Sequence, residues 1–252
     1  MPGVPIGKSR TGIIRLLHED DRYLIVSKPP GLLVHKTPLD AHEPENLRDI
    51  LRNHFSGRID PVHRLDKPTS GVIVFGKDPA AIDNCKQQFE SRETKKVYLA
   101  VVRGHIEAPG CIGKPLPKGM TGSPKMARTT YTPLGRCELN YPVSRYPSAR
   151  FTLVQCTPHT GRYHQIRLHF RHFRHPLIGD SQHGDKHQNR AFAQHTGSRG
   201  LLLHARTFEF THPDGTALKI ESALPPHWMA LQSATGWSIE TLAMDNVTCK
   251  RP

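Results

Sequence analysis

Apolar residues change their spacing along the chain, and the change predicts which segments are strands and which are helices. Apolar runs of strand length cover residues 13–20 and 71–78, whereas the apolar residues within 45–55 recur at the three- and four-residue spacing of a helix. Asp78 stands where it can cap the helix that follows the second run. The same reasoning predicts strands over residues 23–35, 95–106, 150–161, 200–213 and 217–222, and helices over 79–89, 163–173 and 225–236.

The order of these elements indicates the fold class. Strands follow one another with occasional helices between them, without the regular alternation that builds a doubly wound parallel sheet, so we expect an α+β fold. Residues 1–11 resemble a loose basic tail, 12–236 one folded domain and 237–252 a C-terminal tail. Residues 108–125 are rich in glycine and proline, which predicts a long loop there.

Composition and charge narrow the choice of partner. The chain has 252 residues, 36% of them hydrophobic, which is enough to bury a core, and its formal net charge is +13. A polyanion is the natural partner of such a chain. No stretch approaches the ~18 apolar residues of a membrane-spanning helix, and the apolar run near the N-terminus is too short for a signal peptide. We therefore expect a soluble, non-exported protein that binds nucleic acid rather than a membrane.

Motifs for cofactor, metal or redox chemistry do not occur in the sequence. The five cysteines form no CxxC pair, which argues against a disulfide framework and a thiolate zinc site and favours the reducing cytoplasm. No phosphate-binding glycine loop occurs, so we expect no nucleotide cofactor. The histidine-rich stretch 169–175 is interleaved with arginines, which would repel a cation, and we expect no metal site.

The stretch HRLDKPTSG, residues 63–71, sets one carboxylate, Asp66, between Arg64 and Lys67. One interpretation is a surface turn closed by a local ion pair, because proline, serine and glycine favour turns. The other is a site in which positive neighbours keep the carboxylate ionised and a rigid turn aims it. The stretch alone leaves both interpretations open.

Together with four further motifs, this stretch resembles the RluA-type pseudouridine synthase family, whose catalytic motif is HRLD-x-x-TSG followed by an apolar strand. In the family's order, the chain carries segments similar to its KP-x-G, tyrosine, TGR-x-HQ-[IL]-R and late leucine motifs. These segments are SKPPGLLVH at 27–35, KKVYLAVVRG at 95–104, TGRYHQIRLH at 160–169 and LLLHA at 201–205. RYPSARFTLV at 145–154 and HPLIGDSQHGDKHQNR at 175–190 are similar to the tRNA pseudouridine(65) synthase branch of that family.

The resemblance implies a fold and a reaction. The fold is a bent, mostly antiparallel mixed sheet with flanking helices and a central basic cleft, and residues 12–236 are expected to form the catalytic domain without a preceding S4 domain. The reaction isomerises a uridine to pseudouridine in tRNA, at uridine 65, without a cofactor, and we expect a monomeric enzyme. Two alternatives stay open: a synthase acting on large-subunit rRNA, and a non-catalytic RNA-binding protein.

The resemblance also implies roles for individual residues. Asp66 is expected to be the essential aspartate, and Arg167 the arginine that pairs with it inside the cleft. Tyr98 resembles the tyrosine that stacks on the extruded base and takes part in proton transfer. Arg64 stands two residues before Asp66, so in an extended segment both side chains share one face. We expect the Arg64 guanidinium to fill the gap that a flipped base leaves in the RNA.

Three further residues complete the predicted substrate-binding set. Leu203 resembles the apolar residue that lines the uracil pocket, with Leu202 as the alternative register. Arg171 and Arg174 lie off the apolar stripe of the predicted helix, where they either contact phosphate or form a solvated basic face. His63 either orients the motif strand or contacts phosphate, and we leave it outside the catalytic set.

Overall fold

The computed structural model describes residues 3–36, 40–55, 57–117 and 122–239 of the chain. The described strands are β1 (Val4–Ser9), β2 (Gly12–Glu19), β3 (Tyr23–Lys28), β4 (Asp60–Pro61), β5 (Ser70–Gly76), β6 (Lys95–Arg103), β7 (Gly110–Leu116), β8 (Lys125–Leu139), β9 (Ala149–Pro158), β10 (Leu203–Thr211) and β11 (Ala217–Glu221). The described helices are α1 (Leu47–His54), α2 (Pro79–Ser91), α3 (Gln165–His172), α4 (Lys186–Thr196) and α5 (Pro226–Thr235).

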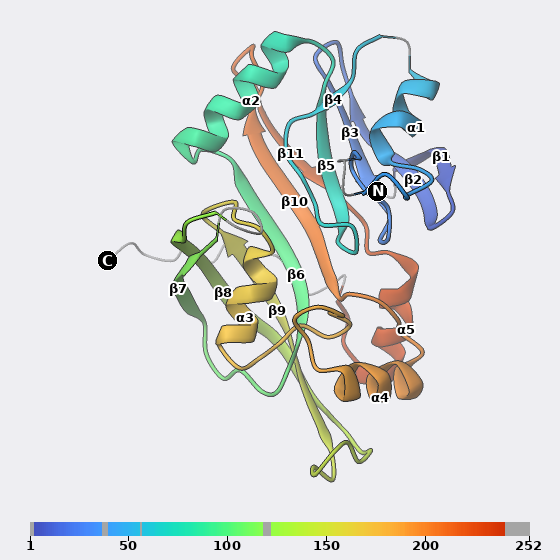
Figure 1. Ribbon diagram of the computed structural model, residues 1–252, viewed down its shortest axis with the longest axis vertical. Coiled ribbons are helices and arrows are strands. Elements are labelled where there is room, and N and C mark those ends of the chain that lie inside the picture. The colour runs from blue at the N-terminus through green and yellow to red at the C-terminus, as the bar shows by residue number, and fades with distance from the viewer. Residues whose placement is uncertain (1–2, 37–39, 56, 118–121, 240–252) are drawn as a thin grey trace.

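These strands form one sheet that runs the length of the molecule (Figure 1). The strand order is β1-β2-β3-β5-β10-β6-β9-β8-β7, with β4 beside β5 and β11 beside β10. Among the described pairs, β5 and β10 run parallel and the others antiparallel. The predicted α+β class, with a mixed and mostly antiparallel sheet, is confirmed.

Two helices of the N-terminal half begin at side-chain caps that the sequence supplies. The Asn46 side chain accepts a hydrogen bond from the backbone N–H of Asp49 at the start of α1. Asp78 accepts one from Ala81, and Pro79 occupies the first turn of α2, where its missing N–H costs nothing. The helix predicted after Asp78 is therefore confirmed, together with its cap.

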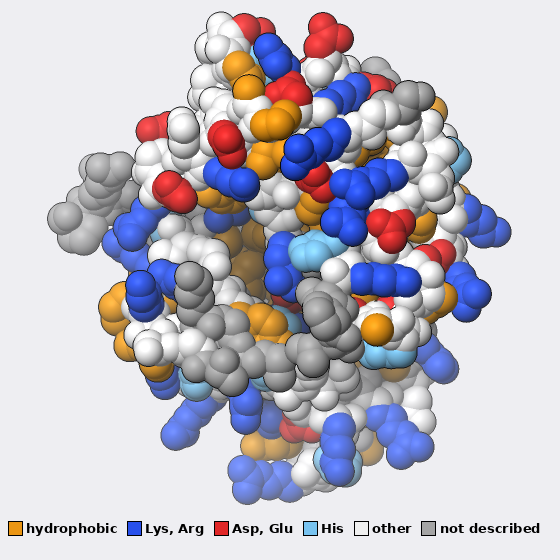
Figure 2. All heavy atoms as spheres, turned by 45° about the horizontal axis from the view of Figure 1, so that its top comes forward, with side chains coloured by type: hydrophobic (Ala, Val, Ile, Leu, Met, Phe, Trp, Pro, Cys, Tyr) orange, Lys and Arg blue, Asp and Glu red, His pale blue; other side chains and the backbone are white. Residues whose placement is uncertain are grey.

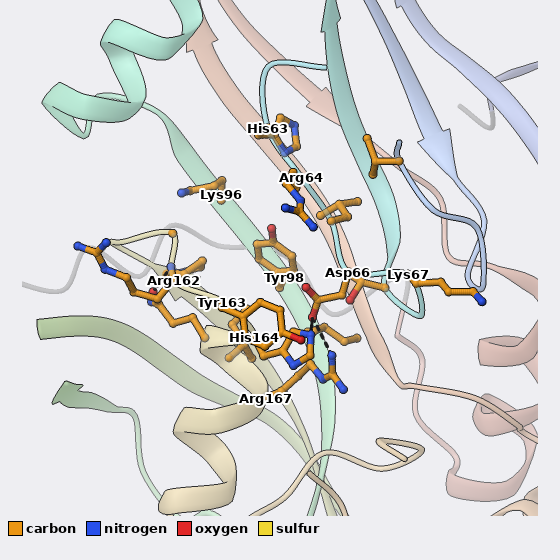
Figure 3. A pocket seen from close by; sticks show the side chains of 18 of the residues that line it. His63, Arg64, Asp66, Lys67, Lys96, Tyr98, Arg162, Tyr163, His164 and Arg167 are labelled. Atoms are coloured by element: carbon orange, nitrogen blue, oxygen red, sulfur yellow. Dashed lines mark hydrogen bonds and ion pairs between the residues drawn. The ribbon is translucent and has the colours of Figure 1, made fainter. Parts of the chain in front are cut away.

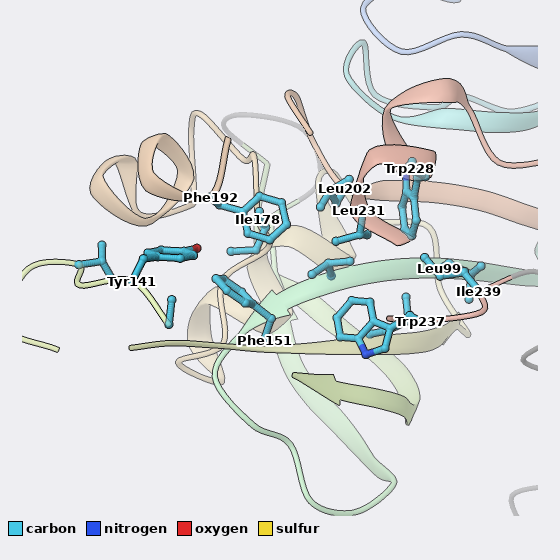
Figure 4. Packing of buried hydrophobic residues seen from close by; sticks show 14 residues of the cluster. Leu99, Tyr141, Phe151, Ile178, Phe192, Leu202, Trp228, Leu231, Trp237 and Ile239 are labelled. Atoms are coloured by element: carbon cyan, nitrogen blue, oxygen red, sulfur yellow. The ribbon is translucent and has the colours of Figure 1, made fainter. Parts of the chain in front are cut away.

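The helices cover both faces of the sheet. Alternate residues of β3 face opposite clusters: Leu24 and Val26 pack with α1, whereas Tyr23 and Ile25 pack with α2. In the other half, α3 packs on one face of β6 and β9, and α4 and α5 pack on the opposite face (Figure 4). Tyr98 of β6 contacts both the α1 cluster and the α3 cluster, so these two clusters lie on the same face of the sheet.

The structure corrects two predictions at the edges of the sheet. Residues 4–9 of the predicted basic tail form β1, and residues 110–116 of the predicted long loop form β7. These are the two outer strands, β1 at one edge and β7 at the other. An edge strand tolerates proline and glycine because one row of its N–H groups has no strand partner, so composition of this kind does not exclude a strand.

The C-terminal boundary also differs from the prediction. Trp237 and Ile239 are 8% and 3% exposed and belong to the core between the sheet, α4 and α5, so the folded domain continues beyond residue 236. The remaining residues of the predicted tail, 240–252, lie outside the described residues. None of the described helices is long and apolar enough to span a bilayer.

Candidate active site

A cleft of about 1000 Å³ opens on the face shared by α1 and α3. Its walls come from the loop before β5, the end of α2, the start of β6 and the loop between β9 and α3. Figure 2 shows a hollow with Lys and Arg side chains on several sides. The charged residues that line the cleft are the cations Arg64, Lys67, Lys86, Arg92, Lys96, Arg162 and Arg167 and the anions Asp40, Asp66 and Glu90.

The HRLDKPTSG stretch forms a tight turn whose backbone is held from behind. The N–H of Thr69 donates to the carbonyl of Asp66 at 3.0 Å, which closes the turn. The carbonyl of Lys67 accepts hydrogen bonds from the N–H of Gly31 at 2.8 Å and from Nζ of Lys28 at 3.0 Å. The upstream SKPPGLLVH segment thus anchors the peptide unit next to Asp66.

Lys28 is a buried cation that shapes this anchor. Its Nζ also donates to the carbonyls of Pro29 and Leu32, at 3.0 and 2.8 Å, so three backbone oxygens surround it. Burial lowers the pKa of Lys28 to about 7, although the charge of Asp66 raises it. These three contacts fix the backbone around the Asp66 turn.

Gly71 ends the motif at a point where the chain leaves no room for a side chain. Its φ is +114°, and a β-carbon there would lie 2.1 Å from the carbonyl oxygen of Ala205. At this point β5 pairs in parallel with β10, in the register Ala205 to Gly71. Only glycine permits this approach, which brings the Asp66 turn next to Leu203 on β10.

Asp66 and Arg167 meet in the cleft as predicted (Figure 3). Arg167 Nη1 donates to Asp66 Oδ2 at 3.0 Å, while its Nε and Nη2 donate to the two oxygens of Asp180 at 2.7 and 2.8 Å. Arg167 and Asp180 are almost fully buried, whereas the Asp66 side chain is 26% exposed to the cleft. Burial raises the pKa of Asp180, but the hydrogen bonds from Arg167 and from the backbone of His183 lower it by more. The net shift of the Asp180 pKa is therefore downward.

The two oxygens of Asp66 have different surroundings. Oδ2 lies 3.0 Å from Arg167 Nη1 and 3.8 Å from His164 Nε2. Oδ1 has no hydrogen-bond partner among the described residues. The arrangement therefore fixes one oxygen and presents the other to the cleft, which is what a carboxylate needs to act as a nucleophile or a base.

Tyr98, Leu203 and Arg64 line the same cleft. Tyr98 lies beside Asp66 (Figure 3), and burial, followed by the charge of Asp66, raises the pKa of its phenol well above the usual range. The phenol is therefore protonated at neutral pH. Leu203 is 3% exposed and faces the cleft, whereas Leu202 belongs to the core on the other face of the sheet, so the structure distinguishes the two registers.

The structure does not bring Arg171 and Arg174 into the cleft. Both are exposed, and neither lines it, so their contact with phosphate stays a prediction. His63 stacks on Phe208 with ring centroids 5.0 Å apart, and its Nε2 accepts a hydrogen bond from the N–H of Val74. Burial lowers the pKa of His63 to about 3, so the ring is neutral and can accept this bond. These contacts favour the strand-orienting interpretation of His63.

Three residues of the site were not anticipated from the sequence: Asp180, His164 and His183. The signal that could have pointed to Asp180 is a carboxylate in the apolar run HPLIGD, because a buried carboxylate needs a cationic partner. In the described part of the chain, no group of three or more His, Cys, Asp or Glu side chains is arranged to hold a metal ion.

Comparisons with known proteins show which proteins this chain is similar to. The family model described as RNA pseudouridylate synthase matches residues 22–172. A tRNA pseudouridine synthase C of Pasteurella multocida (strain Pm70) is 38% identical over 240 residues, which cover 91% of this chain and 99% of that protein. The protein of the same name from Haemophilus influenzae is 38% identical over 236 residues, which cover 89% and 99%.

Among solved structures, human RNA pseudouridylate synthase domain containing 4 is similar with a TM-score of 0.66 and 24% sequence identity. The match covers 87% of this chain and 92% of that one. At this identity the likeness concerns the fold.

Proposed function

Because the chain belongs to the RNA pseudouridylate synthase family, we propose that it isomerises uridine to pseudouridine in tRNA, with Asp66 as the catalytic carboxylate. The observation that carries this proposal is the geometry of Asp66. Arg167 holds one carboxylate oxygen, and the other is turned to the cleft without a partner among the described residues.

The reaction breaks the bond between N1 of uracil and C1′ of ribose and forms a bond between C5 and C1′, so it is an isomerisation. One carboxylate oxygen is enough for each role proposed for Asp66: a nucleophile at C1′, a nucleophile at C6, or a base at the C2′ proton. A phenol with a raised pKa is a poor base at neutral pH. Tyr98 therefore acts as a stacking surface for the base, and its neutral O–H can donate a hydrogen bond.

The charges of the cleft support an RNA substrate. Arg64, Arg92, Lys96 and Arg162 have no carboxylate partner among the described residues, and Arg162 Nε is buried without an acceptor. Unpaired cations in a cleft with one catalytic carboxylate suit a polyanion, since each can bind a phosphate without first breaking an ion pair. We propose that this is the predicted basic cleft, and that Arg64 fills the gap left by the extruded uridine.

The choice of tRNA rests on relatives that bear the name tRNA pseudouridine synthase C. We propose uridine 65 as the target from the resemblance of residues 145–154 and 175–190 to that branch. The cytoplasmic location, the monomeric state and the absence of a cofactor remain predictions made from the sequence.

Site-resolved pseudouridine mapping tests the proposal. Carbodiimide labelling and primer extension would be applied to tRNA and rRNA from cells in which the gene is deleted and then restored as wild type or as Asp66→Ala. We expect the modification at tRNA position 65 to be lost on deletion and restored by wild type alone. Loss at an rRNA site instead would overturn the substrate, and restoration by Asp66→Ala would overturn the catalytic role.

A further inference from the structure

Two histidines stand behind the catalytic carboxylate and have no place in the reaction described above. His164 Nε2 lies 3.8 Å from Asp66 Oδ2, and His164 Nδ1 lies 2.8 Å from His183 Nε2. The His164 ring stacks on Tyr163 with centroids 3.7 Å apart and meets the His183 ring edge-on. Its side chain is 8% exposed, so the ring is held on several sides.

The backbone of His164 shows that this position of the ring has a cost. Its φ and ψ are 49° and 32°, the left-handed region that a residue with a β-carbon adopts against a steric penalty. His164 is the N-cap residue of α3, yet its side chain makes no cap hydrogen bond. The His164 ring faces Asp66 and His183 and does not cap the N–H groups at the start of α3.

One loop supports both groups that face Asp66 Oδ2. The Asp180 side chain holds Arg167, and its Oδ1 also accepts hydrogen bonds from the backbone N–H groups of Gln182 and His183 at 3.0 Å. Asn189 of α4 closes this loop, because its Nδ2 donates to the Asp180 carbonyl at 3.0 Å and its Oδ1 accepts from the N–H of Gly179 at 2.8 Å. The carboxylate that holds Arg167 and the ring that contacts His164 thus belong to the same loop.

The hydrogen-bond inventory favours one arrangement of protons. If His164 carries its proton on Nε2, that N–H faces the Asp66 carboxylate, and Nδ1 accepts a hydrogen bond from Nε2–H of His183. His183 Nδ1, which is buried without a partner among the described residues, is then an unprotonated nitrogen. The reverse arrangement points the His164 Nε2 lone pair at a carboxylate and buries an N–H of His183 without an acceptor, which costs more.

Both rings are neutral near pH 7. Burial lowers the pKa of His164 to about 4, although the charges of Asp66 and Asp180 raise it and that of Arg167 lowers it again. The pKa of His183 is also lowered, first by burial. A neutral pair can share one proton in the way just described, whereas two protonated rings would repel each other.

We propose that His183 is a positioning residue: it donates to His164 Nδ1 and so keeps the Nε2–H of His164 directed at Asp66 Oδ2. Arg167 then holds Oδ2 by a hydrogen bond at 3.0 Å, the N–H of His164 faces the same oxygen from 3.8 Å, and Oδ1 is the atom that reacts with the nucleotide. The proposal rests on the proposed function for its effect on catalysis, but the state of the two rings is a property of the free protein.

Two measurements test this inference. In the first, ¹⁵N-resolved NMR of the wild-type protein at pH 7 identifies the protonated nitrogen of each ring, without RNA. We expect Nε2–H for both His164 and His183; a proton on Nδ1 of His164 would overturn the assignment. Because this reading needs no substrate, it stands apart from any failure of the protein to form pseudouridine.

The second measurement compares variants at position 183 on tRNA. His183→Leu cannot donate to His164, and we expect it to lower kcat by about tenfold, the effect of one lost positioning interaction, with KM unchanged. His183→Gln can donate through its amide and should recover most of the loss, and His187→Leu, an exposed histidine of α4, serves as the control. Wild-type kcat in His183→Leu, or no recovery in His183→Gln, contradicts the proposal; if His183→Leu does not fold, His183→Gln and the NMR assignment still decide.

Discussion

At the scale of single residues, Arg167 joins two carboxylates that differ in exposure and therefore in task. Asp180 is 1% exposed and takes two of the guanidinium N–H groups, whereas Asp66 is 26% exposed and takes one. The buried pair fixes the guanidinium, so that the third contact can hold Asp66 without enclosing it. A carboxylate that must react benefits from a partner whose own position is already set.

Replacing Asp180 by asparagine should show this support in the pH dependence of stability. Asp180→Asn leaves the Arg167 charge buried with a weaker partner, and we expect a loss of about 3–5 kcal/mol in the free energy of unfolding at pH 7. The pKa of Asp180 is lower in the folded than in the unfolded state, so its contribution is present above the unfolded value of about 3.9 and is lost as the pH falls through the folded value. Denaturant titrations should therefore show a constant difference between the two proteins from pH 7 down to about pH 4 and a smaller difference at lower pH.

The control for this experiment is Asp83→Asn, because Asp83 is 66% exposed on α2. A change below about 0.5 kcal/mol is expected for it at each pH. If Asp180→Asn were as stable as wild type at pH 7, the supporting role of Asp180 would be wrong.

The residues that the sequence did identify share one property: each lies inside a recognisable local motif. Asp66, Tyr98 and Leu203 come from three different strands or turns, and the sheet brings all three to one cleft. Asp180 and His183 also lie in a quoted segment, residues 175–190, but the resemblance gave them no role, because their contacts with Arg167 and His164 depend on how this loop packs against the start of α3. Arg167 was predicted as a partner of Asp66, but its second carboxylate was not.

At the scale of elements, the success of sequence reasoning follows how many residues of a strand are buried. The central strands β3 and β5 are buried on both faces and have apolar runs that identify them. The missed strands β1 and β7 lie at the edges, where one side of the backbone needs no strand partner and proline is tolerated. The strand β8, which pairs with both β7 and β9, was also missed, because few of its residues are buried and most of the others are polar. The helix α4 was missed because its buried positions are few and its remaining residues are polar.

The contact between β5 and β10 gives a prediction at this scale. Gly71→Ala would place a β-carbon 2.1 Å from the carbonyl oxygen of Ala205, so β10 must move or the pairing must break. We expect a loss of more than about 3 kcal/mol in the free energy of unfolding, measured by denaturant titration. Gly113→Ala on the edge strand β7 is the matched control, since nothing lies within 4 Å of its β-carbon and its effect should stay within about 1 kcal/mol. Equal stability of the two variants would show that the close approach does not constrain the fold.

At the scale of the whole molecule, the net charge of +13 acts through two kinds of cation. Some cations are paired on the surface, as Lys77 is with Glu19 and Lys95 with Glu209. Others line the cleft without a carboxylate partner among the described residues, as Lys96 does, whose Nζ lies 5.2 Å from the centre of the Phe89 ring. Both kinds attract RNA at a distance, but only the second kind can contact the phosphates of a bound strand directly.

Lys95 and Lys96 separate these two effects, because they are neighbours on β6 and point to opposite faces of the sheet. Lys95→Met and Lys96→Met each remove one positive charge, so both reduce the long-range attraction equally. The logarithm of the tRNA binding constant should depend less steeply on the logarithm of the salt concentration in Lys96→Met, by about 0.7–0.9, the share of one phosphate contact. Lys95→Met should keep the wild-type slope, because Lys95 is 75% exposed and lies 3.7 Å from Glu209. Equal slopes for the two variants in filter-binding titrations would mean that RNA does not enter this arm of the cleft.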